Sequence, residues 1–171
     1  MMAALLETAV LRRMLIELKR CNAIDKLNLN PASTDARMDK YVQRVSRAFF
    51  APMAMISVVQ GNRLWLKARH GLDMQSALRS EAFCEHVLDS VEPLEVCDAL
   101  AHELFRDFPL VTGDIGVRYY IGMPLILSNG IGIGSLCVFD TVKRLGASRE
   151  QLALLKAMAH QAAISLEYQM Q

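Results

Sequence analysis

The chain has 171 residues, which is the usual size of one folded domain. Its 19 Lys and Arg residues nearly balance 18 Asp and Glu residues, and 53% of the residues are apolar. This composition excludes a disordered or collagen-like chain. The formal net charge of +1 lacks the basic excess that is typical of nucleic-acid binders, so we expect no nucleic-acid partner.

The cysteines and the N-terminus indicate a reducing environment. The four cysteines are Cys21, Cys84, Cys97 and Cys137. Because no two of them form a CxxC pair, the spacing predicts neither a zinc site nor a thioredoxin-like site. Glu7, Arg12 and Arg13 interrupt the first apolar run, which is unlike a signal peptide. We therefore expect a cytoplasmic protein that does not enter a membrane.

The first fifty residues predict two helices. Apolar residues spaced by four and three positions predict a helix over residues 3–20, and the residues that set this spacing are Leu11, Leu15 and Leu18. After a loop, the capping residues at 33–35 predict the start of a second helix, which Pro52 follows.

The middle of the chain changes to strand periodicity. The continuous apolar run 53–59 predicts a buried strand, and alternation over 64–69 predicts a half-buried strand that follows a tight turn. A short helix is expected over 80–90 and a short strand over 93–98. Residues 99–116 show no strong period but carry enough apolar side chains to pack onto the domain.

Two further strands and a terminal helix complete the pattern. Residues 117–127 and 131–139 predict strands, joined by a turn in which Asn129-Gly130 favours positive φ at both central positions. This uncharged region contains Pro124 and several glycines, which disfavours a membrane-spanning helix. Ser148 and Gln151 form a capping-box pattern that predicts a last helix running to the end of the chain.

These elements predict one α+β domain over residues 1–171 with the order α-α-β-β-α-β-loop-β-β-α. The five strands are expected to form an antiparallel sheet. We expect the terminal helices, residues 1–20 and 148–171, to cover one face and the segment 80–116 to cover the other. The apolar spacing of the terminal helices also predicts a homodimer that forms through a helix bundle.

Six stretches in chain order resemble motifs of the GAF domain, a small sensory and regulatory module. They are Trp65–Lys67 with His70–Leu72, Phe83–His86, Val96–Ala99, Phe105–Gly113, Val117–Leu125 and Ile133–Asp140. The resemblance implies a sheet of five or six antiparallel strands, helices behind it and a ligand pocket in front. It also implies binding rather than catalysis, dimerisation through the outer helices, and a neighbouring histidine kinase or diguanylate cyclase output module. It leaves the ligand or cofactor unidentified.

Position along the chain selects the candidate ligand-binding residues. They are Phe83, Cys84, Asp98, Phe105, Phe108, Arg118, Tyr119 and Tyr120. We expect Phe105 and Phe108 to form an apolar lid, while Asp98, Arg118 and tyrosine hydroxyls hold a small polar or anionic molecule. The alternative is that Asp98 and Arg118 pair with each other or cap backbone groups. No catalytic or metal-binding residues are predicted.

Several more specific functions fit the sequence less well. Cys84-Glu85-His86 differs from the adjacent Cys-His pair of bilin-binding relatives, and the cyclic-nucleotide signature is absent. The histidines that could ligate haem are His70, His86, His102 and His160, and each is a more ordinary surface or core residue. Two alternatives remain open: a redox enzyme similar to free methionine sulfoxide reductases, using Cys84, Cys97 and Cys137, and a ligand-free structural dimerisation module.

Overall fold

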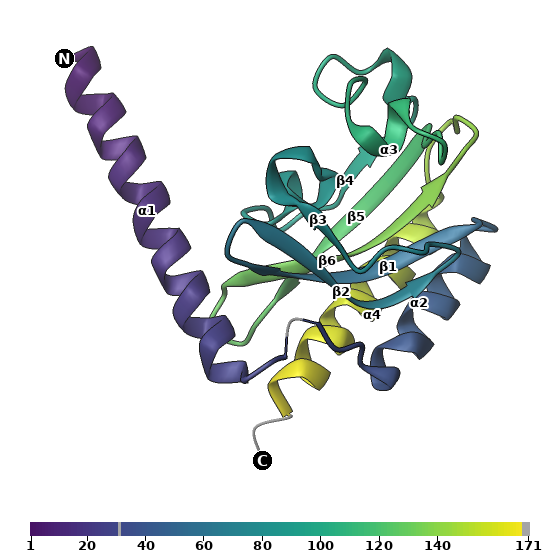
Figure 1. Ribbon diagram of the computed structural model, residues 1–171, viewed down its shortest axis with the longest axis horizontal. Helices are drawn as coiled ribbons and strands as arrows, with labels where there is room; N and C mark the ends of the chain where they lie inside the picture. Colours follow the sequence, from purple (N-terminus) through teal and green to yellow (C-terminus); the bar gives the residue numbers. More distant parts are fainter. Residues whose placement is uncertain (31, 169–171) are drawn as a thin grey trace.

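A six-stranded antiparallel sheet forms the centre of the computed structural model, which describes residues 1–30 and 32–168. The strands are β1 (Met53–Gln60), β2 (Arg63–His70), β3 (Ser76–Leu78), β4 (Leu94–Val96), β5 (Tyr119–Ile126) and β6 (Gly132–Asp140). Their spatial order is β3-β2-β1-β6-β5-β4 (Figure 1). The apolar strands β1 and β6 lie at the centre, where both sheet faces are covered. The predicted α+β antiparallel fold is confirmed.

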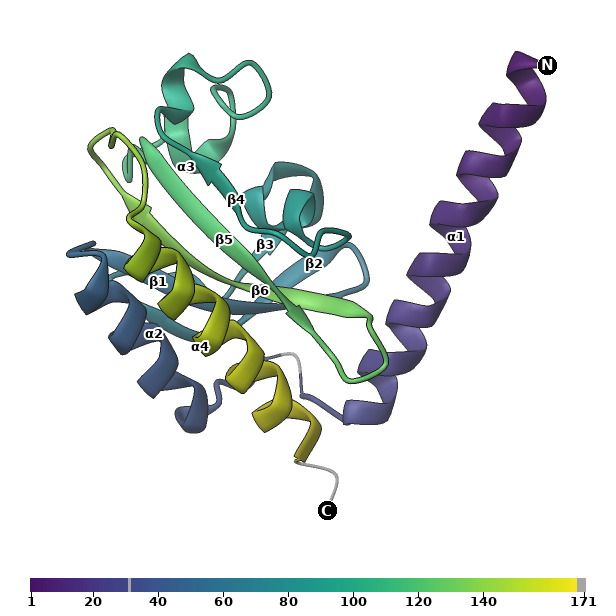
Figure 2. The same ribbon diagram turned by 180° about the vertical axis from the view of Figure 1, so that it is seen from behind.

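Two amphipathic helices cover one face of the sheet. They are α2 (Ala36–Ala48) and α4 (Arg149–Glu167), which lie side by side in Figure 2. The Tyr41 hydroxyl joins them through a hydrogen bond of 2.7 Å with Ser165 Oγ. The predicted capping box of Ser148 and Gln151 is present at the start of α4. Asp35 caps α2 by accepting from the Arg37 amide.

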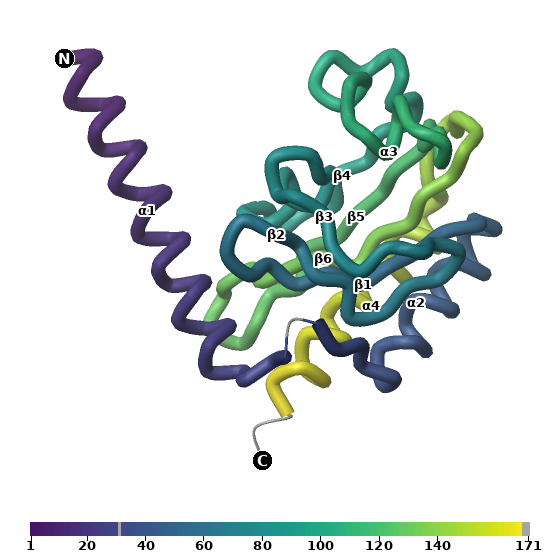
Figure 3. The backbone as a smooth tube through the Cα atoms, in the orientation of Figure 1, coloured from purple at the N-terminus to yellow at the C-terminus, as the bar shows by residue number. Residues whose placement is uncertain are grey.

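The opposite face carries a cover segment, which we define as residues 79–92 and 99–116. It contains the 3-10 helices η1 (Arg79–Glu81), η2 (Phe83–Val87) and η3 (Ala99–Ala101) and the short helix α3 (Pro109–Thr112). Figure 3 shows the path of this segment over the sheet. The helix expected over 80–90 is thus two short 3-10 turns, because extended backbone at Ala82 separates them.

The helix α1 (Met2–Leu27) extends away from the sheet (Figures 1 and 2). It is longer than the predicted helix over 3–20, and it does not cover the sheet as expected; α2 takes that place beside α4. Only its last turns are buried in the domain, through Arg20, Ala23, Ile24 and Leu27. The physical reason is that α2 concentrates its apolar residues on one stripe, whereas those of α1 are spread around the helix.

The turn between β5 and β6 differs in detail from the prediction. Gly130 has a positive φ of 82°, whereas Asn129 is not among the residues with positive φ. The Gly130 amide donates to the Leu127 carbonyl, and the Ile131 carbonyl accepts from the Leu127 amide. A three-residue loop with glycine at its left-handed position therefore joins the strands, and only one residue needs that conformation.

Candidate functional site

An aromatic cluster fills the space between the cover segment and the sheet. We define it as Phe83, Phe105, Phe108, Tyr120 and Phe139. The Phe83 ring stacks on Phe105 and Tyr120, with centroids 4.6 and 4.8 Å away. Phe83, Phe105 and Tyr120 are each at most 1% exposed. Most of the predicted apolar pocket residues therefore come together, but as packed side chains that occupy the predicted pocket.

A buried thiol pair lies beside this cluster. Cys84 from η2 and Cys137 from β6 place their Sγ atoms 3.3 Å apart, and both residues are fully buried. The Tyr120 hydroxyl donates to Cys84 Sγ over 3.7 Å. Tyr120 can reach this sulfur because it lies along its strand over Gly122, where a Cβ would be 2.0 Å from the hydroxyl oxygen. The sequence prediction named Cys84 for the ligand site and both cysteines for the redox alternative.

The two thiols have different acidities. Hydrogen bonding with Cys137 lowers the pKa of Cys84 to about 7, against the opposing effect of burial. Ser135, Tyr120 and Ser57 contribute in the same direction. Burial raises the pKa of Cys137, as do its hydrogen bond to Cys84 and the charge there. The site therefore favours one thiolate, at Cys84, next to one protonated thiol.

Asp98 and Arg118 line a separate surface hollow of about 370 Å³. The Arg118 guanidinium donates to the carbonyls of Val111 and Val117 at 3.1 and 3.0 Å. The Asp98 carboxylate lies 4.0 Å from Lys143 Nζ. Arg118 thus caps backbone groups, as the alternative reading of the sequence proposed, and its contacts hold the end of α3 close to the start of β5. Both residues remain partly exposed at the hollow.

Tyr119 lies on the opposite face of the sheet from Tyr120. Its hydroxyl donates to Glu95 Oε1 at 2.7 Å, and the same oxygen accepts from the Ala147 amide. Burial raises the pKa of Tyr119, and the hydrogen bond to Glu95 adds to this effect. Because successive side chains of a strand point to opposite faces, these two tyrosines cannot line one site. Tyr119 instead anchors the loop that precedes α4.

A network of ion pairs holds the base of α1 against the cover segment. We call it the α1 clamp: Glu17, Arg20, Arg79, Glu85 and Asp89. Glu17 Oε1 accepts from Arg79 Nη1 at 2.5 Å, and Arg79 Nε donates to Glu85 Oε2 at 2.7 Å. The buried Arg20 pairs with Glu17 and Asp89. Sequence analysis missed this network, since its partners are up to 69 residues apart.

The α1 clamp also connects α1 to the sheet, and its arginines keep Glu17 ionised. Arg20 Nε donates to the Gly132 carbonyl at 2.7 Å, which ties α1 directly to the first residue of β6. The hydrogen bond from Arg79 lowers the pKa of Glu17, with Arg20 acting in the same direction and burial against it. Glu17 therefore stays ionised below the usual range of a glutamate, which keeps the contact between α1 and the cover segment charged.

Within residues 1–30 and 32–168, no three His, Cys, Asp or Glu side chains gather as metal ligands do. In that same part of the chain, no helix has both the length and the apolar character that crossing a bilayer requires.

The sheet order, the cover segment and the helix pair α2 and α4 define a class of small α+β domains. The GAF domain family model matches residues 33–166, and the chain belongs to this family. GAF domains are typically sensory or regulatory. The resemblance stated from the sequence motifs is confirmed.

The chain is also similar to individual known proteins. It is 32% identical over 136 residues to a cyclic di-GMP phosphodiesterase of Pseudomonas aeruginosa, covering 80% of this chain and 23% of that protein. The chain therefore spans about a quarter of the length of that curated relative.

Solved structures share the fold at low sequence identity. The GAF domain of a phosphoenolpyruvate-protein phosphotransferase from Coxiella burnetii has a TM-score of 0.66 and 19% identity, covering 88% of this chain and 92% of that one. A type II free methionine-R-sulfoxide reductase from Thermoplasma acidophilum has a TM-score of 0.64 and 16% identity, covering 78% and 92%.

Proposed function

We propose that this chain is a non-catalytic sensory or regulatory domain that binds a small molecule on its cover side and passes the change to α1. The observation that carries the proposal is the position of η2. Phe83 and Cys84 of this short helix point into the aromatic cluster and the thiol pair. The next residue, Glu85, belongs to the α1 clamp. One turn of backbone therefore connects the interior of the domain to its long outer helix.

The coupling follows from the geometry of a short 3-10 helix. A molecule that displaces the Phe83 ring moves η2, because Phe83 and Glu85 lie within one turn of this 3-10 helix, which has three residues per turn. Glu85 then shifts relative to Arg79, which also holds Glu17 of α1. Because charged hydrogen bonds depend steeply on distance and angle, a small shift there changes the orientation that α1 prefers.

The ligand proposal rests on the cover segment and the hollow beside it. Phe105 and Phe108 are held over the sheet by aromatic contacts within the cover segment, so a ligand that replaces these contacts can enter beneath it. The partly exposed Asp98 and Arg118 at the hollow offer one charge of each sign. This combination suits a small molecule with an apolar body and a polar or anionic group.

Thermal unfolding tests this ligand site. Wild type, Arg118→Ala and the matched surface control Arg149→Ala are screened against a panel of small carboxylates and phosphorylated metabolites. We expect a compound that raises the melting temperature of wild type and of Arg149→Ala, and that loses its effect on Arg118→Ala. An equal shift in all three proteins removes Arg118 from the site.

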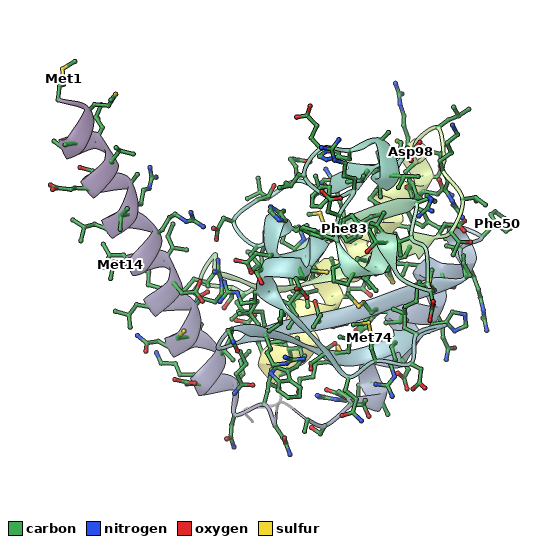
Figure 4. The ribbon with its side chains drawn as sticks, turned by 45° about the horizontal axis from the view of Figure 1, so that its top comes forward. Met1, Met14, Phe50, Met74, Phe83 and Asp98 are labelled. Atoms are coloured by element: carbon green, nitrogen blue, oxygen red, sulfur yellow. The ribbon has the colours of Figure 1, made fainter. Side chains whose placement is uncertain are left out.

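We further propose that two copies associate through α1. Large apolar side chains are exposed along its first five turns: Met2, Leu5, Leu6, Val10, Leu11, Met14, Leu15 and Leu18. Figure 4 shows Met14 projecting from a part of α1 that stands clear of the sheet. A helix that is apolar on most sides is stable in water only when a partner covers it, and an identical helix offers the same apolar surface. By contrast, the main apolar stripe of α4 is buried against the sheet, so α4 is not the centre of this interface.

Light scattering on the purified chain tests the dimer. We expect wild type to have twice the chain mass of 19.1 kDa, and Leu11→Glu/Leu18→Glu to have the mass of one chain. The control is Leu145→Glu, which adds charge at a fully exposed leucine of the domain body. A wild-type monomer at high concentration contradicts the proposed dimer.

The output partner is proposed from the relatives. The matched protein of Pseudomonas aeruginosa is a cyclic di-GMP phosphodiesterase, and this chain aligns with only 23% of it. We propose that the domain regulates such a phosphodiesterase, a diguanylate cyclase or a histidine kinase, in the cytoplasm. The test is a fusion in which a catalytic module is joined ahead of α1: its turnover should change between wild type and Arg79→Ala, which breaks the α1 clamp, and an unchanged turnover contradicts coupling through α1.

A second function, reduction of free methionine sulfoxide, is favoured by one observation. The sulfur atoms of Cys84 and Cys137 are 3.3 Å apart, close enough for a thiolate and a resolving thiol. The test is turnover of free methionine sulfoxide with a dithiol reductant, compared with Cys84→Ser. Turnover that depends on Cys84 overturns the non-catalytic proposal. A third function, a ligand-free dimerisation module, is favoured by the packed aromatic cluster, which fills the predicted pocket. Native mass spectrometry tests it, and dimers with no bound small molecule support it.

A further inference from the structure

The geometry points to a dithiol site at Cys84 and Cys137 that a peroxide oxidises reversibly to a disulfide. This inference does not depend on the proposed ligand; it uses the same sulfur pair as the sulfoxide-reduction alternative but needs only a peroxide and no sulfoxide substrate. Both cysteines are free thiols in the structure, and their Sγ atoms are 3.3 Å apart. A disulfide bond is about 2.05 Å long, so the two sulfurs must approach by about 1.2 Å. A change of this size lies within the reach of side-chain rotation and small backbone movement.

Cys84 is free to move farther than Cys137 when the two sulfur atoms approach each other. Cys137 lies in β6, which pairs with β1 on one side and β5 on the other, so its position is fixed by two ladders of hydrogen bonds. Cys84 lies in η2, a 3-10 helix of only five residues. Short 3-10 turns have weaker hydrogen-bond geometry than sheets, so η2 supplies most of the approach.

The hydrogen-bond partners of the two cysteines make Cys84 the nucleophilic thiolate and Cys137 the protonated thiol. The Tyr120 hydroxyl donates to Cys84 Sγ, and the Cys137 thiol is in hydrogen-bond contact with the same atom. The Tyr120 hydroxyl stabilises a thiolate on Cys84, in line with the lowered pKa of that thiol. The single proton of the Cys137 thiol has two acceptors within reach, Cys84 Sγ and the Met55 carbonyl at 3.8 Å, and both favour the protonated form of Cys137 beside the nucleophile.

The reaction balances with hydrogen peroxide as the oxidant. The Cys84 thiolate attacks one peroxide oxygen, the O–O bond breaks, and Cys84 becomes a sulfenic acid while hydroxide leaves and is protonated to water. Cys137 then loses its proton and attacks the Cys84 sulfur; the S–S bond forms, the S–O bond breaks, and a second water leaves. Two thiols and one peroxide give one disulfide and two waters. A low-molecular-weight dithiol restores the pair.

Access to the pair sets the rate of the reaction. Both residues are 0% exposed, and Phe83 and Tyr120 pack beside Cys84. Oxidation therefore requires transient opening of η2, and the small size of peroxide favours it over bulky disulfide oxidants. The exposed Cys21 and the partly exposed Cys97 have no such protection. They must be removed so that their reactions do not obscure the buried pair.

The test uses the full chain carrying Cys21→Ser/Cys97→Ser, treated with hydrogen peroxide, unfolded and alkylated. We expect the intact mass to fall by two hydrogen atoms with no alkylation, and a dithiol to restore two alkylated cysteines. With Cys137→Ser added, a sulfenic-acid reagent should label Cys84 several-fold faster than it labels Cys137 in the chain with Cys84→Ser added.

Three outcomes overturn the inference. They are full alkylation of both cysteines after peroxide treatment, equal sulfenic-acid labelling of the two single-cysteine chains, and oxidation that proceeds only to sulfinic acid. If the serine variants fail to fold, peptide mapping of the oxidised wild-type chain gives the same decision. A Cys84–Cys137 cross-linked peptide supports the site, and its absence rejects it. The ligand and dimer assays are to be run with a reductant present, so that their results do not depend on this outcome.

Discussion

Replacing Phe83 with alanine removes the ring at the centre of the aromatic cluster and measures how tightly the cover segment is packed. The ring is 1% exposed. Burying a phenylalanine side chain contributes about 1.5–3 kcal/mol. Each of its two stacked contacts, with Phe105 and Tyr120, adds about 0.5–1.5 kcal/mol. Because neighbours relax into part of the cavity, we expect Phe83→Ala to lower the free energy of unfolding by about 3–5 kcal/mol.

Equilibrium unfolding in urea checks this value. With a slope of about 2 kcal/mol per molar urea, a loss of about 4 kcal/mol lowers the midpoint by about 2 M. The matched control is Phe50→Ala, since Phe50 is 90% exposed and the change there should cost less than about 0.5 kcal/mol. A loss below about 1 kcal/mol for Phe83→Ala would refute the reasoning, because it would mean that the cover side is a loosely filled pocket rather than a packed cluster.

Three further predictions concern single interactions. Gly122→Ala places a Cβ against the Tyr120 hydroxyl and should lower the free energy of unfolding by about 1–3 kcal/mol. The near-ultraviolet circular dichroism spectrum should change because the Tyr120 ring must move, and an unchanged spectrum contradicts the packing. The pKa of Glu17 is lowered in the folded state, chiefly by Arg79, so its stabilising effect is present at neutral pH and is lost on acidification. The stability difference between wild type and Glu17→Gln should therefore shrink as the pH falls from about 5 through the lowered pKa of folded Glu17, and a constant difference contradicts the charge pairing. Ser148→Ala removes the cap of α4 and should cost about 1 kcal/mol in thermal unfolding, whereas no loss means the cap is replaced by water.

The sheet could be predicted from the sequence because its strands carry local signals. The apolar run at 53–59 is too continuous for a strand with one exposed face, and the structure places it at the sheet centre. Asn129-Gly130 marked the hairpin between the last two strands. The edge strand β3 was not predicted, since three residues give too short a pattern for alternation to be recognised.

The placement of α1 could not be predicted from its own residues. Leu11, Leu15 and Leu18 fit a helix that covers a sheet and equally fit a helix that awaits a partner. Which of these occurs depends on competition with α2, whose one-sided stripe fills the place beside α4. That competition is a tertiary effect and leaves no local signal.

The candidate site was predictable in composition but only partly in geometry. Phe83 and Tyr120 came together as expected, whereas Tyr119 faces the other side of the sheet. Alternation along the predicted strand could have separated the two tyrosines. The contact between Cys84 and Cys137 joins residues 53 positions apart, which no spacing rule reveals.

The length of α1 gives its anchored base mechanical leverage. The helix is held at Arg20, and the helical residues before it extend for about 27 Å at a rise of about 1.5 Å per residue. A tilt of about 10° at this pivot displaces the start of the helix by about 5 Å, about one helical turn. A displacement of less than 1 Å near Glu85 is thus converted into a several-fold larger displacement of the N-terminal end of α1. A displacement of that size changes which side chains are in contact there.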